Sequence, residues 1–272
     1  MTAPTAMPRL VRAELFKFRT TPGPWVCMAV VVLLTGLGVT TSFILGNHGA
    51  VHFSAPTTTV QLRRLMGAGY TAAIVMAPVL GVLCITTEYR HRILTATLLL
   101  HPRRPDVLTA KVLASAVWGV FMAVVSFAMV AAMGIPLLVA EGGSVSHFLD
   151  QIGPVVPGML AAFLLLAVYG MGIGTLVRNQ IAGVILALGL SLVLEPIIVA
   201  IFASLLHMDV NFLPTRATQA IAGGLAARGA GGGTAVTITA LLSWWLGALA
   251  LVVWGVGTSV IGYFTTFRRD VT

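Results

Sequence analysis

Charged residues are scarce in this sequence. Only 9% of the 272 residues are Asp, Glu, Lys or Arg, whereas 58% are hydrophobic, and the mean hydropathy is +0.99. A water-soluble domain carries roughly 25% charged residues. So few charges do not cover a water-facing surface, whereas lipid accepts an apolar exterior. The composition therefore excludes an ordinary soluble domain and indicates an integral membrane protein.

Lysine and cysteine are almost missing, and catalytic motifs are absent. Neither Lys17 nor Lys111 follows a glycine-rich turn, so neither belongs to a P-loop that would hold ATP phosphates. Cys27 and Cys84 lie inside apolar runs and indicate no disulfide framework. The six histidines form no H-E-x-x-H pair and no Cys/His metal spacing, and no G-x-S-x-G elbow occurs. We expect no catalytic residue, no metal and no cofactor in this chain.

Long apolar runs dominate what is present. Segments that are apolar on all sides for about 20 residues are typical of membrane-spanning helices, since β-barrel strands alternate over about ten residues. Lipid also requires every backbone polar group to be paired within the segment. The sequence predicts an all-α, polytopic fold in one transmembrane domain, with six spans at residues 25–45, 66–86, 112–139, 154–177, 181–206 and 237–264.

The arginines and lysines predict the orientation, because they are enriched in cytoplasmic loops. With the N-terminus inside, the inner segments hold Arg9, Arg12, Lys17, Arg19, Arg90, Arg92, Arg103, Arg104, Lys111, Arg178, Arg268 and Arg269. The outer segments hold only Arg63, Arg64, Arg216 and Arg228. Both termini are therefore predicted to be cytoplasmic. These short clusters flank apolar runs, so the formal charge of +8 indicates membrane anchoring and not nucleic-acid binding.

A charged segment precedes the first span. Residues 8–20 place Val11, Leu15 and Phe18 on one helical seam, whereas the charges, which include Glu14, Lys17 and Arg19, lie mostly elsewhere. This pattern favours a helix lying in the membrane interface. The alternative is a positively charged flank without a stable helix. The Thr-Pro-Gly-Pro sequence at 21–24 ends this segment, because proline breaks a helix interior.

Two further features concern packing and the outer side. Gly170 and Gly174 form a G-x-x-x-G pair, which predicts close helix packing within the chain. Residues 207–236 form a long, semi-apolar outer segment. Its first half either re-enters the outer leaflet as short helices or is an ordinary exposed loop, and the sequence favours neither.

Glu195 is the one ionisable residue near the middle of a predicted span. Placing a charge there costs about 3 kcal/mol on insertion scales, so the side chain is expected to face the bundle, a partner chain or a water-filled path. Pro196 follows and leaves the carbonyl of Leu192 without its usual helical donor. One hypothesis places Glu195 and Pro196 at a translocation path or gate. The alternative is a protonated glutamic acid that only bonds a neighbouring helix.

The inner loop at residues 87–111 is the most informative segment. It is basic at both ends, and its middle, 93–100, is apolar enough for a short helix that Pro102 would end. Asp106 is expected to cap the third span. The functional interpretation is a projection that docks on a cytosolic partner. The alternative is a simple amphipathic loop.

On these motifs the chain resembles the permease subunits of type-2 ATP-binding-cassette (ABC) exporters, in the form common in actinobacteria. One motif precedes the first span, with Glu14, Lys17 and Arg19. The others follow in order along the inner loop: Glu88-Tyr89-Arg90, Thr97-Leu98, Pro102-Arg103-Arg104 and Lys111. The family often has Gly-Thr soon after Glu-Tyr-Arg, where this chain has Arg92 and Ile93.

The resemblance implies a specific role for the inner loop. It would be the coupling helix, with ATPase contact through Glu88, Tyr89, Arg90, Arg92, Thr97, Pro102, Arg103, Arg104 and Lys111. A separate ATPase subunit would bind the ATP, and a second permease chain, identical or different, would complete a dimer in the bacterial inner membrane. The cargo would be a hydrophobic drug, antibiotic, peptide or lipid. A membrane scaffold that recruits cytosolic proteins and an intramembrane enzyme are the competing interpretations.

Overall fold

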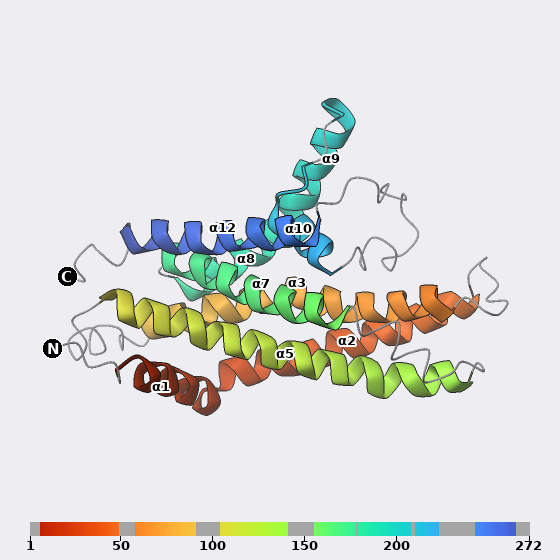
Figure 1. Ribbon diagram of the computed structural model, residues 1–272, viewed down its shortest axis with the longest axis horizontal. Helices are drawn as coiled ribbons and strands as arrows, with labels where there is room; N and C mark the ends of the chain where they lie inside the picture. The colour runs from red at the N-terminus through yellow and green to blue at the C-terminus, as the bar shows by residue number, and fades with distance from the viewer. Residues whose placement is uncertain are drawn as a thin grey trace.

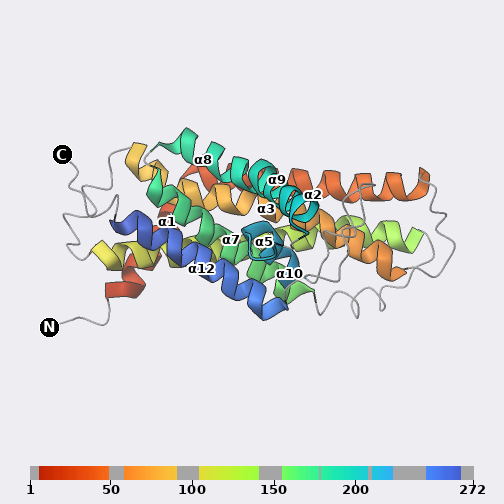
Figure 2. The same cartoon turned by 90° about the horizontal axis from the view of Figure 1, so that it is seen from above.

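The computed structural model describes residues 6–48, 58–90, 104–140, 155–177, 179–207, 210–222 and 243–264. Within these ranges all regular secondary structure is helical, which confirms the all-α prediction. Six stretches are long and apolar enough to cross a membrane: Pro22–Ser42, Met66–Arg90, Pro105–Leu137, Val156–Leu176, Gln180–Leu205 and Trp244–Gly262. Apart from the second half of Gln180–Leu205, they run side by side as an elongated bundle (Figures 1 and 2).

The helices follow the order α1 (Ala6–Thr20), α2 (Pro22–His48), α3 (Thr58–Arg90), α5 (Arg104–Ala140), α7 (Val156–Leu176), α8 (Gln180–Gly189), α9 (Glu195–Leu205), α10 (Pro214–Ile221) and α12 (Trp244–Gly262). A short π-helical turn, η1 (Leu190–Leu194), joins α8 to α9. α1 and the C-terminal end of α12 lie at the same end of the bundle (Figure 1), as an even number of spans requires. We call this end the inner end, in keeping with the predicted orientation.

Proline and asparagine set several helix boundaries. α1 ends at Thr20 and α2 begins at Pro22, so the chain breaks where the sequence predicts. Pro22 and Pro24 lie in the first turn of α2, where a missing N–H costs no helical hydrogen bond. Asn179 caps α8, because its side chain accepts from the backbone N–H groups of Ile181 and Ala182.

The helices on both sides of the inner loop are longer than the apolar runs suggest. α3 continues to Arg90 and α5 begins at Arg104, so Asp106 lies in the first turn of α5 and the prediction that it caps this helix is wrong. The reason is that the first turns of α5 already bury apolar side chains, with Val107 1% exposed and Ala110 fully buried. The predicted short helix at residues 93–100 lies outside the described residues.

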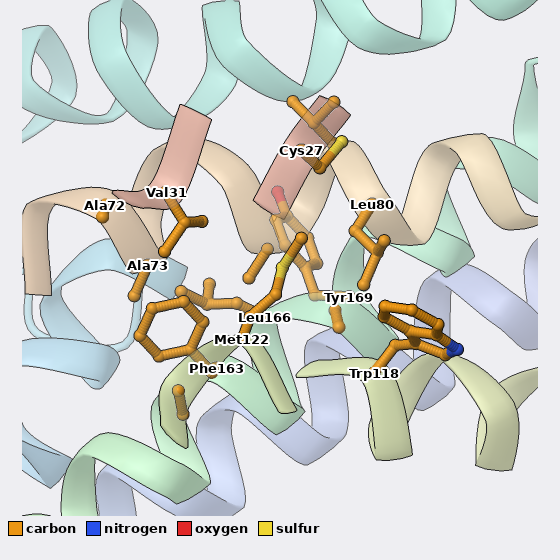
Figure 3. Packing of buried hydrophobic residues seen from close by; sticks show 14 of the residues in the cluster. Cys27, Val31, Ala72, Ala73, Leu80, Trp118, Met122, Phe163, Leu166 and Tyr169 are labelled. Carbon is orange, nitrogen blue, oxygen red and sulfur yellow. The ribbon is translucent and has the colours of Figure 1, made fainter. Parts of the chain in front are cut away.

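α7 occupies the centre of the bundle and packs against α3, α5 and α12 (Figure 2). Figure 3 shows Met122 and Leu166 meeting between these helices, with Phe163 and Trp118 on either side. Close approach depends on glycine: a Cβ atom on Gly170 would lie 2.0 Å from the backbone oxygen of Pro78 on α3. The predicted packing role of this glycine is therefore confirmed within the chain.

Replacing Gly170 with alanine is expected to destabilise the bundle by about 1–3 kcal/mol, because the backbone of α3 has to move away. The matched control is Gly257→Ala on α12, where a new Cβ meets nothing within 4 Å. This control should be neutral or slightly stabilising, since alanine favours a helix. Unfolding by SDS titration in detergent micelles measures both changes. Equal stability of the two variants would contradict the close packing of α3 on α7.

The fifth span bends away from the bundle. α8 lies along the other helices, whereas α9 projects sideways from them (Figure 1). The bend coincides with η1 and with Pro196 at the start of α9, the kind of site where helices kink sharply. The chain then returns as α10, whose buried residues include Ala217 and Thr218. Within the described part of the outer segment, helix begins at Pro214, at the end of the stretch for which short helices and an exposed loop were both predicted as alternatives.

Candidate functional site

Four charged side chains, of which three are buried, form one network at the inner end of the bundle. The Lys111 ammonium lies 2.6 Å from Glu88 Oε1 and 2.8 Å from Glu14 Oε2. The Lys17 ammonium lies 2.7 Å from Glu14 Oε1 and 2.8 Å from Glu88 Oε1. Each lysine therefore bridges both carboxylates. We call these four residues the inner ion network.

Three helices supply this network. Glu14 and Lys17 lie one turn apart on α1, on the same face. Glu88 lies in the last turn of α3, and Lys111 lies two turns into α5. Since α3 ends and α5 begins at the two sides of the inner loop, the Glu88–Lys111 pair joins both ends of that loop. Glu14 and Lys17 connect this Glu88–Lys111 pair to α1.

Burial makes the network sensitive to any change of charge. The Lys111 side chain is 0% exposed, and those of Glu14 and Glu88 are 6% and 7% exposed. Two acids and two bases balance, which is the condition for holding charges in a low-dielectric site. Removal of one member leaves an uncompensated buried charge, which is strongly destabilising. The network therefore holds α1, α3 and α5 in one arrangement.

Aromatic contacts support α1 beside the network. Phe18, which is 6% exposed, stacks on Trp118 of α5 with ring centroids 5.7 Å apart. Trp25 meets the edge of the same ring, and its indole N–H donates to the carbonyl oxygen of Arg19 at 3.0 Å. The apolar seam predicted for α1 therefore faces α5, and the Arg19 side chain is exposed.

Of the other residues predicted to contact an ATPase, Tyr89 and Arg90 lie next to the network, and they have different surroundings. Tyr89 packs against a small apolar cluster with Ile85 and Met171. Arg90 is exposed, and its Nη1 donates to Gln180 Oε1 at 3.3 Å. The structure does not describe Arg92, Thr97, Pro102 or Arg103. It describes the backbone of Arg104 but not its side chain.

Glu195 forms a second polar contact, remote in sequence from the first. Its side chain is buried at 3% exposure, and its Oε2 accepts hydrogen bonds from the backbone N–H and the hydroxyl of Thr215. Thr215 is the second residue of α10, where backbone N–H groups have no helical acceptor. Glu195 therefore caps α10 from the end of η1. Among the described residues, no group bonds its other oxygen, Oε1.

Thr215, the partner of Glu195, and Tyr70, which bonds Thr215 in turn, were not predicted from the sequence. Tyr70, which is 1% exposed, donates from its hydroxyl to the carbonyl oxygen of Thr215 at 3.0 Å and fixes α10 to α3. Pro214 was the available signal, because proline is favoured at the first position of a helix. A predicted helix start at Pro214 would have placed the backbone N–H of Thr215 in the first turn, where it is available to donate to Glu195. Nothing in the sequence singles out Tyr70.

Comparison with known proteins identifies the family. A family model described as "ABC-2 family transporter protein" matches residues 10–194, which is more than half of the 272 residues. The match contains the whole inner ion network and ends immediately before Glu195. No curated protein matches the sequence significantly. With its six candidate spans, the chain is a multi-pass membrane protein, consistent with the bacterial inner membrane, and it belongs to the ABC-2 family of transporter proteins as a permease subunit of an ABC transporter.

Proposed function

We propose that this permease subunit drives export by coupling to a separate ATPase subunit through residues 87–111. The observation that carries the proposal is the Glu88–Lys111 ion pair, which joins α3 to α5 at the base of the inner loop. A partner that moves the loop would move both helix ends together. Because Lys17 pairs with Glu88 and Glu14 pairs with Lys111, α1 would move with them.

The chemistry of the chain supports an external energy source. Neither of its two lysines, Lys17 and Lys111, belongs to a P-loop. ATP would be bound by the partner ATPase, whose closure would push on the basic loop. A second permease chain would complete the path. The fifth span offers an exposed apolar face for it, since Ile181 and Ile185 are 70% and 65% exposed.

The proposal is tested by purifying the chain with and without a candidate P-loop ATPase subunit from the same organism. We expect no ATP turnover by the chain alone, and a several-fold increase in the ATPase rate when the two are combined in proteoliposomes. Association without any stimulation would favour a membrane scaffold. Turnover of a substrate by the isolated chain would favour an intramembrane enzyme. Either of these results would contradict the coupling proposal.

We place Glu195 and Pro196 at the gate of the translocation path, because Glu195 connects the bend in the fifth span to α10. π-Helical turns of the kind found here occur frequently at functional sites. An isosteric Glu195→Gln change keeps an acceptor oxygen for Thr215 but removes the charge. We expect transport in vesicles to fall about tenfold, whereas association with the ATPase stays unchanged, since a hydrogen bond to a charged group is worth roughly 1.5–3 kcal/mol. Normal transport would show that Glu195 only joins helices.

A further inference from the structure

A cavity of about 330 Å³ lies beside the inner ion network. Its lining comes from the junction of α1 and α2, the last turns of α3 and the first residue of α8. Its volume is within the range of small-molecule binding sites. All of these elements meet at the inner end of the bundle, the level at which lipid headgroups meet the protein. We call this space the inner-leaflet cavity.

The inner-leaflet cavity has an apolar part and a cationic part. Phe18, Pro24 and Leu83 contribute apolar surface, and Lys17 and Arg90 contribute positive charge. A cavity with both characters at this depth suits an amphipathic ligand whose polar group is anionic. A wholly apolar ligand would leave Arg90 without an anionic partner.

The two cations have hydrogen-bond donors to spare. Two of the three N–H donors of Lys17 are directed to Glu14 and Glu88, and its side chain is still 37% exposed. Within the described part of the chain, Arg90 donates to Gln180 and takes part in no ion pair. The two carboxylates of the lining are already balanced by Lys17 and Lys111. Among the residues that the structure describes, Arg90 is thus the cation of the cavity without a carboxylate partner. A guanidinium binds a phosphate through two parallel N–H groups.

We propose that the inner-leaflet cavity holds the phosphate headgroup and the adjoining part of one acyl chain of a phospholipid of the cytoplasmic leaflet. The phosphate binds Arg90 and the free donor of Lys17, and an acyl chain runs along Pro24 and Leu83. The lipid thereby contacts α1, α3 and α8 beside the inner ion network. This inference depends on the membrane location of the chain and is independent of the proposed coupling to an ATPase.

The test measures lipid retention by native mass spectrometry. The full-length chain is purified, delipidated in detergent, and mixed with equal amounts of dioleoyl phosphatidylglycerol and dioleoylglycerol, which lacks the phosphate. We expect one phosphatidylglycerol per chain and no retained dioleoylglycerol. Arg90→Gln should weaken this binding about tenfold, as the loss of a charge-assisted hydrogen bond does. The matched control is Arg12→Gln, an exposed arginine of α1 outside the cavity lining, which should bind as the wild type does.

A second variant tests the space without changing the charge. Gly23 lines the cavity, and a Cβ atom there would meet only Leu83 Cδ1, at 3.9 Å. Gly23→Met therefore has room to enter the cavity and should displace the lipid. Retention of the lipid by both Arg90→Gln and Gly23→Met would overturn the proposal, as would an equal loss in Arg12→Gln. Displacement of the lipid by soluble glycerol 3-phosphate would assign the site to free phosphate compounds and would overturn the lipid assignment.

Discussion

Replacement of Lys111 with methionine is expected to lower the free energy of unfolding by about 3–5 kcal/mol, the loss typical of breaking a buried ion pair. Methionine matches the length of the lysine stem, so packing is largely kept. The charge is lost, and Glu14 and Glu88 then share Lys17 alone. The network keeps one carboxylate too many in a buried site. SDS titration of the purified variant in micelles measures the loss.

Two companion variants separate charge balance from packing. Lys17→Met leaves the same excess of one carboxylate, but the ammonium that it removes is 37% exposed whereas Lys111 is 0% exposed. Water can reach the vacated position, so the loss of stability should be smaller than for Lys111→Met. The double variant Lys111→Met with Glu88→Gln restores neutrality and should recover part of the lost stability. A Lys111→Met variant as stable as the wild type, or a double variant worse than the sum of its single changes, would contradict the account of the network.

Reversal of charge on the loop is expected to abolish association with the ATPase. In Arg103→Glu with Arg104→Glu, two cations of the proposed docking surface become anions, and like charges brought together at an interface cost several kcal/mol. Co-purification of the tagged chain with the ATPase measures the loss, which should exceed about a hundredfold in affinity. Arg9→Glu with Arg12→Glu is the matched control, since these exposed arginines belong to α1. Unchanged association of the loop variant would remove the docking assignment.

Sequence patterns predicted the membrane class, the helical fold and the residues of the inner end, because these depend on local composition and periodicity. Helix ends next to the loop were less predictable. Apolar burial of Val107 and Ala110 extends α5 toward the loop although the local sequence is polar. A pattern of polar residues therefore underestimates a helix whose end is stabilised by tertiary packing.

The four residues of the inner ion network were singled out from the sequence, but their contacts with one another were not predicted. Glu14 and Lys17 were assigned to an interfacial helix, and Glu88 and Lys111 to a coupling loop, as two separate groups. Their contacts join residues 71 and 97 positions apart in the chain, and no local pattern specifies such a pairing. It arises because Phe18 packs on Trp118 and so places α1 against α5. For Glu195, a bond to a neighbouring helix was one of the two predicted alternatives. Its partner, Thr215, was not identified from the sequence.

The most direct test of coupling through residues 87–111 is accessibility labelling of a single cysteine at the centre of that loop. Thr97→Cys is introduced together with Cys27→Ala and Cys84→Ala, so that the two free native cysteines cannot react with the label. Sealed vesicles of either orientation are then treated with a membrane-impermeant maleimide. We predict that Thr97→Cys is labelled only from the cytoplasmic face and becomes protected when the ATPase binds. Labelling from the exterior, or labelling that the bound ATPase leaves unchanged, would contradict the account.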